Sequence, residues 1–219
     1  MDRRLSVAVA VGAAGVALAW RLWLLLGKAT APLPAALRAI HSGSREVEVV
    51  VRKSAPTDRA LLPLKIADRI WFTVPMIANS YRAYAFALSN CPPGVGALLK
   101  AALAECLDQS AAFGFLSGRH DPSAGAVVDS NEGVPFTTVR VEHALPEGAE
   151  HSEELLYRLA DIRPSAEVAA GRAPLATATL ALFSDGGAVL AVSASHAVLD
   201  GEALMRFVSE WVREGRKRK

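Results

Sequence analysis

The sequence has little cysteine and little excess charge of either sign. Its 219 residues include two cysteines, Cys91 and Cys106, and carry a formal net charge of +2. The two cysteines have no metal-ligand spacing and no neighbouring cluster of histidines, so we predict reduced thiols or core fillers and expect no metal site. A net charge this close to zero produces no strong positive field, which argues against nucleic acid as a partner.

Three common catalytic and nucleotide-binding motifs are also missing. The chain has no Gly-x-Ser-x-Gly elbow, no Walker loop and no dinucleotide fingerprint. Repeats and low-complexity tracts are absent as well. These absences leave one histidine–aspartate stretch near the C-terminus as the strongest candidate for chemistry.

Apolar residues, in contrast, are plentiful and are concentrated at the N-terminus. They make up 52% of the chain, and residues 5–26 read LSVAVAVGAAGVALAWRLWLLL, with Arg21 as the one charge. As a helix this run would be roughly 33 Å long, about the thickness of a bilayer core. Arg21 could extend its charge to the interface beside Trp20 and Trp23. We therefore predict an N-terminal hydrophobic helix that anchors the chain in a membrane.

Two other interpretations of this segment stay open. It could be a cleaved secretory targeting segment, because Arg3 and Arg4 precede the apolar run. It could also be a buried helix of a soluble protein. Basic residues on both sides of the run leave its orientation open; we expect the globular part to face the cytoplasm.

The positions of the apolar run and of the proline- and glycine-containing stretch divide the chain into three parts. Residues 1–30 form the anchor or targeting segment, and residues 31–44 form a linker with two prolines at its start and His-Ser-Gly-Ser at its end. Residues 45–219 form the globular part. Its pattern predicts strands at 46–53, 81–88, 125–130, 134–142, 177–183 and 188–195, and helices after 94, over 152–161 and from about 201. Residues 184–187, Ser-Asp-Gly-Gly, predict a hairpin. The mixture without strict alternation predicts an α+β fold, with a sheet flanked by helices.

The stretch AVSASHAVLDGEAL places a histidine and an aspartate four residues apart where a strand gives way to a helix. If the strand extends to His196, alternation places Leu190, Val192 and Ala194 on the same face. The imidazole then ends an apolar row and is partly desolvated, which disfavours its charged form. A neutral histidine near pH 7 can accept a proton, as a general base must.

Asp200 and Gly201 complete this stretch. Asp200 could cap the following helix, or it could turn inward and hold an arginine, such as Arg119 or Arg140. Gly201 allows the backbone to turn tightly. A plainer interpretation stays open, because a lone histidine at a strand end is usually a core residue and Asp-Gly after a strand is usually a turn.

Three stretches carry a resemblance to a known family. Residues 196–201 have the pattern HxxxDG, and the helical sequence EALMRFVSEW follows. Residues 98–119 are a helical stretch that ends in Leu-Ser-Gly-Arg, and residues 127–136 read VVDSNEGVPF. In this order and spacing they resemble the N-terminal half of the BAHD family, the plant-type acyl-CoA-dependent acyltransferases. The resemblance covers roughly residues 45–212.

This resemblance implies a fold and a reaction. The fold is a chloramphenicol acetyltransferase-like lobe, and the reaction moves an acyl group from acyl-CoA, as co-substrate, to a hydroxyl or amine of a small acceptor. His196 takes the place of the catalytic base, while Asp200 and Gly201 take structural places in the motif. No tightly bound cofactor is implied.

Departures from the family pattern leave alternatives open. BAHD enzymes have a second half with a DFGWG motif, which this sequence lacks, so we expect self-association or a missing second lobe. The chain could also be a non-catalytic, membrane-anchored binding module derived from the fold. A condensation-type or wax-ester-type domain, which shares HxxxDG, is a third possibility.

Overall fold

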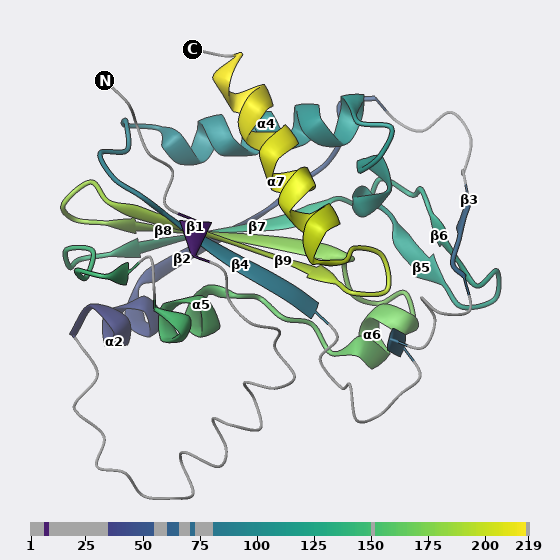
Figure 1. Cartoon of the computed structure of the whole chain (residues 1–219), viewed down its shortest axis with the longest axis horizontal. Coiled ribbons are helices and arrows are strands. Elements are labelled where there is room, and N and C mark those ends of the chain that lie inside the picture. The colour runs from purple at the N-terminus through teal and green to yellow at the C-terminus, as the bar shows by residue number, and fades with distance from the viewer. Residues whose placement is uncertain are drawn as a thin grey trace, which may run out of the picture.

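A mixed six-stranded sheet with helices on both faces organises the protein (Figure 1). The computed structural model describes residues 7–8, 35–54, 61–65, 71–72, 81–149 and 152–217. A second sheet, of three strands, lies at one end of the large one (Figure 1). This arrangement confirms the predicted α+β fold with a mixed sheet between helices.

The large sheet has five pairs of neighbouring strands, of which one is parallel and four are antiparallel. The spatial order is β1 (Val7–Ala8), β4 (Tyr81–Leu88), β9 (Ala188–Ser195), β8 (Ala176–Phe183), β7 (Val134–Val141) and β2 (Ser44–Val50). The β7–β8 pair is parallel and the other neighbours are antiparallel. The predicted hairpin joins β8 to β9, with Gly186 at a φ of 79°. The small antiparallel sheet has the order β3 (Leu61–Pro63), β6 (Ala126–Val128) and β5 (Arg119–Asp121).

Two pairs of helices cover the two faces of the large sheet (Figure 1). α4 (Val95–Gln109) and α7 (Gly201–Arg216) pack on one face, and α2 (Ala35–Ser42) and α5 (Glu153–Leu159) on the other. The indole N–H of Trp211 in α7 donates to the carbonyl of Leu99 in α4 at 2.8 Å, which satisfies the polar atom of a fully buried side chain. The short helix α6 (Ser165–Ala169) lies beside β5, and a 3-10 turn spans Gly114–Ser117.

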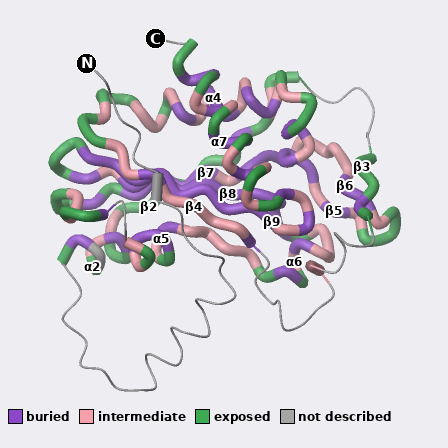
Figure 2. The backbone as a smooth tube through the Cα atoms, in the orientation of Figure 1, coloured by how far each residue is buried: buried purple, intermediate pink, exposed green. Residues whose placement is uncertain are grey.

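Strand β9 is buried along its whole length, because both of its faces are covered (Figure 2). Leu190, Val192 and Ala194 belong to the core under α4 and α7. Val189 and Ala191 belong to the core on the opposite face. The alternation read from the sequence is therefore confirmed within the strand, which ends at Ser195, one residue before His196.

One segment differs from the sequence-based expectation. The linker predicted over 31–44 contains helix α2, because Ala36 and Ile40 lie one turn apart and bury against the sheet and α5. At the other end of the chain, the helix predicted from about 201 continues to Arg216, and Lys217 bridges to Glu214 at 2.8 Å.

The predicted N-terminal helix over residues 5–26 is wrong at the two positions that the structure describes. Val7 and Ala8 form strand β1, which pairs with the edge strand β4 opposite Phe86 and Ala85. An edge strand offers unpaired backbone groups, and the alternating Val-Ala sequence can add to it. The remaining residues of the expected helix lie outside the described part of the chain. Within the described residues, no helix is both long and apolar enough to cross a bilayer.

Candidate active site

The candidate site lies where β9 ends and α7 begins. Ser195, the last residue of β9, donates its backbone N–H to the carbonyl of Leu175 at 2.8 Å. The carbonyl of Ser195 accepts the N–H groups of Val198 and Leu199, both at 3.1 Å. These bonds tighten the chain into a turn directly after the strand, and His196 is the first residue of that turn.

His196 is half-buried and meets Arg82 from the neighbouring strand β4. Arg82 pairs with Ala194 in the register of the two strands, so it projects on the same face as the histidine. A guanidinium nitrogen of Arg82 lies 3.0 Å from Nε2 of His196. Arginine can only donate, so Nε2 must accept and the proton of the neutral ring sits on Nδ1.

The surroundings favour the neutral imidazole. Burial lowers the pKa of His196 below its usual 6.5, while a contact of the ring with its own backbone raises it. The Arg82 guanidinium lowers this pKa further, and the Asp200 carboxylate opposes with the smallest effect. Nδ1 is buried, and no atom of the described residues meets full hydrogen-bond geometry with it. The net result is a histidine that is neutral near pH 7, with the lone pair of Nε2 facing Arg82.

Trp71 covers one face of the imidazole. The two ring centroids are 4.0 Å apart and the planes are 9° from parallel. Such a stack restricts rotation of the histidine ring and removes water from one of its faces. The ring is thus oriented by two side chains, Trp71 on its face and Arg82 at its edge.

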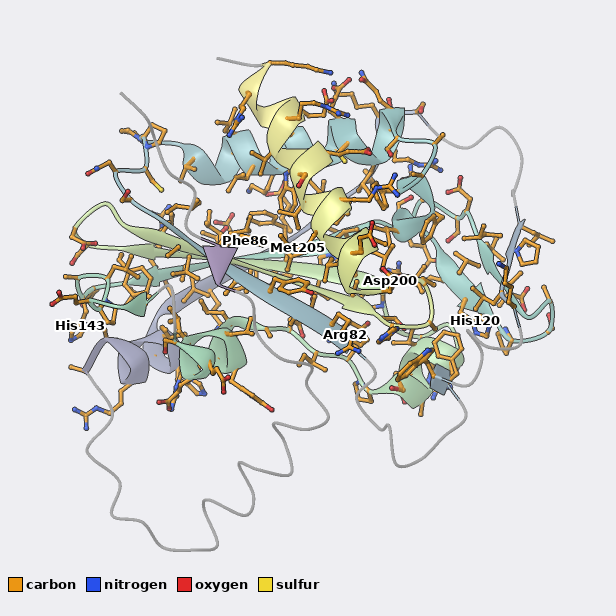
Figure 3. The ribbon with its side chains drawn as sticks, in the orientation of Figure 1. Arg82, Phe86, His120, His143, Asp200 and Met205 are labelled. Atoms are coloured by element: carbon orange, nitrogen blue, oxygen red, sulfur yellow. The ribbon has the colours of Figure 1, made fainter. Side chains whose placement is uncertain are left out.

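Asp200 caps helix α7. Its carboxylate accepts the backbone N–H of Ala203 at 2.8 Å, and its side chain is exposed beside the start of the helix (Figure 3). The expected arginine partners are wrong. Arg119 contacts Glu132 at 3.4 Å, and Arg140 is exposed on β7 at the far end of the sheet.

Gly201 is required by a close contact rather than by a special backbone angle. A Cβ atom at this position would lie 2.8 Å from the hydroxyl oxygen of Tyr84 in β4. That distance is well below a normal carbon–oxygen contact. Glycine therefore lets the first turn of α7 lie against β4, next to Arg82.

Two further histidines of the described chain, His120 and His143, have other surroundings (Figure 3). His120 is buried in β5, and its Nδ1 lies 2.6 Å from the carbonyl of Ala169 in α6. His143 is exposed at the opposite end of the molecule (Figure 3). Cys91 and Cys106 are not joined by a disulfide, and the described residues contain no cluster of metal ligands.

A neutral histidine, held at the end of a central strand and followed by a capped helix, defines a candidate general-base site in a mixed α+β lobe. The chain belongs to the Transferase family, of the BAHD type, whose family model matches residues 45–219. No curated protein sequence matches it.

Solved structures share the fold at low sequence identity. Vinorine synthase is 20% identical, with a TM-score of 0.61 over 80% of this chain and 43% of its own. SgcC5 from Streptomyces globisporus is 16% identical, with a TM-score of 0.50 over 71% and 36%. F. graminearum TRI101, complexed with coenzyme A and T-2 mycotoxin, is 12% identical, with a TM-score of 0.50 over 72% and 40%. The chain thus spans less than half of each of these proteins.

Sequence reasoning found His196, Asp200 and Gly201 but missed Arg82 and Trp71. One signal for Arg82 was present, since it is the single charge in the otherwise apolar strand YRAYAFAL. Trp71 gave no comparable signal, because nothing in the local pattern connects it to a histidine 125 positions later.

Proposed function

We propose that this chain carries the general-base lobe of an acyl-CoA-dependent acyltransferase, with His196 as the base. The observation that carries the proposal is the environment of His196, whose ring is held neutral with its lone pair on Nε2. Membership in the Transferase family supports the reaction class.

The proposed reaction moves one acyl group. Nε2 of His196 takes the proton of an acceptor hydroxyl or amine while the oxygen or nitrogen attacks the thioester carbonyl. The tetrahedral intermediate then collapses, the carbon–sulfur bond breaks, and the coenzyme A thiolate takes the proton back from the imidazolium. Histidine ends in its starting state, and no cofactor or redox partner is consumed.

Asp200 and Gly201 serve this reaction through the scaffold. The cap by Asp200 fixes the first turn of α7, and Gly201 allows that turn to approach β4. Both effects set the position of the loop that carries His196. In this proposal neither residue exchanges a proton with substrate.

Acyl-CoA as the donor is part of the proposal. The coenzyme A bound by TRI101 in its crystal structure supports this choice. Because the chain spans less than half of such proteins, we propose that a second lobe or a second copy supplies the opposite wall of the site.

For the N-terminus, the apolar residues that follow β1 in the sequence, up to Leu26, support attachment to a membrane. This proposal rests on the sequence, and it places the globular part on the cytoplasmic side.

Loss of thioester absorbance, with mass detection of the acylated acceptor, tests the function. His196→Ala should lower turnover by roughly two to four orders of magnitude, the usual contribution of a positioned base. His143→Ala, which removes an exposed histidine far from the site, is the matched control and should keep full activity. Acyl transfer by His196→Ala at the rate of the unmodified chain would overturn the assignment.

A further inference from the structure

The contact between Arg82 and His196 creates a conflict for a general base. The guanidinium donates to Nε2, which is the same lone pair that must accept the proton of the acceptor. While this contact persists, an incoming hydroxyl cannot reach the base. Something must therefore draw Arg82 away before the proposed reaction begins.

Arg82 also differs from the other partly buried arginines of the described chain. Arg52 contacts Asp129, Arg119 lies 3.4 Å from Glu132, and Arg158 lies 3.0 Å from Glu154. No carboxylate of the described residues pairs with Arg82, and His196 is the partner that its guanidinium has. A partly desolvated cation that has no carboxylate partner among the described residues is unfavourable, so this position would favour a bound anion.

The carboxylate of Asp200 already has a partner of its own. Among the described residues, the charged groups that act on His196 are Arg82 from β4 and Asp200 from the start of α7. Asp200 holds the N–H of Ala203 as the helix cap, and its side chain is exposed. It is therefore not the counter-anion of Arg82.

We propose that Arg82 binds a carboxylate carried by the acyl acceptor, and that this binding frees Nε2 of His196 for the acceptor's own hydroxyl or amine. The inference rests on the proposed function and specifies its substrate class. The phosphates of coenzyme A are an unsuitable source of the anion, because the pantetheine arm separates them from a thioester placed at His196.

This arrangement makes the base responsive to its substrate. A carboxylate accepts two parallel N–H groups of a guanidinium, a stronger interaction than the single bond to a neutral imidazole. An acidic acceptor thereby turns Arg82 away from Nε2, whereas a neutral acceptor leaves it in place. Discrimination between acids and their amides then follows from one residue.

Nuclear magnetic resonance of the full chain with labelled histidine tests this binding directly. The probes are mandelate and mandelamide, which share a hydroxyl and a ring and differ in the carboxylate. Mandelate should bind about tenfold more tightly than mandelamide and should shift the His196 signals. Arg82→Gln should abolish this preference, Arg82→Lys should keep part of it, and the exposed Arg140→Gln should keep all of it.

The outcomes separate the two proposals. Equal binding of acid and amide by the unmodified chain, or an undiminished preference in Arg82→Gln, would overturn the role of Arg82. An Arg82-dependent preference for malonyl-CoA over acetyl-CoA, with none for mandelate, would assign the carboxylate to the acyl group and overturn the acceptor assignment. The binding measurement does not depend on turnover. If the chain bound mandelate through Arg82 but transferred acyl groups without His196, the proposed function would be overturned and the role of Arg82 would stand.

Discussion

Replacing Asp200 by alanine tests whether this residue acts as a helix cap or has another role in the site. In the structure its carboxylate is exposed and accepts one backbone N–H, that of Ala203 at 2.8 Å. Loss of such a cap costs about 1 kcal/mol of unfolding free energy. For a protein of this size, that corresponds to a fall of roughly 2–4 °C in melting temperature. A buried ion pair with an arginine would instead cost about 3–5 kcal/mol.

Urea unfolding followed by circular dichroism measures this loss. Asp200→Ala should lower the denaturation midpoint without a change in slope. Asp200→Asn is the matched control, because asparagine caps as well as aspartate, and it should restore most of the stability. A loss above about 3 kcal/mol, or an asparagine variant as unstable as the alanine one, would refute the cap as the role of Asp200.

Three further predictions follow from the same region and from the N-terminus. Gly201→Ala should destabilise the chain by about 1 kcal/mol more in the presence of Tyr84 than in a Tyr84→Phe background, because the hydroxyl oxygen would lie 2.8 Å from the new Cβ; additive unfolding free energies would contradict this contact. The pKa of His196 is lowered on folding, so the unfolded chain takes up its proton first as pH falls below 6.5. Acid should therefore destabilise the unmodified chain more than His196→Gln, and identical stability–pH curves would disprove the shift. If the proposed membrane attachment holds, deletion of residues 1–30, which also removes the short strand β1, should release the chain from membranes with little change in its circular dichroism spectrum; retention after an alkaline wash would show that the attachment lies elsewhere.

Local patterns predicted the strands and helices that frame the site, but not the contacts between them. The division of β9 between the two sheet faces follows from alternation along a single strand, and the position of α7 follows from its apolar stripe. Arg82 meets His196 because two strands far apart in sequence pair in one antiparallel register. That register depends on tertiary packing, so no window of sequence contains it.

The misassigned segments have physical reasons of the same kind. Helix α2 escaped notice because it is short and begins just after Pro34, in a stretch that otherwise looks like a linker. Ile40 gains its stability from burial against α5 and the sheet, which a local pattern does not show. At Val7, pairing with the edge of β4 prevails over the helical interpretation of an apolar run.

The proposed role of His196 as a general base is tested most directly by measuring the protonation state of its imidazole. Nitrogen-15 shifts of the imidazole, recorded across a pH series and assigned by comparison with His196→Gln, report the midpoint and the tautomer together. We expect a pKa below 6.5 and, at higher pH, a neutral ring with the proton on Nδ1 and none on Nε2. A pKa above 6.5, or a neutral ring protonated at Nε2, would contradict the assignment of His196 as a base ready to accept a proton.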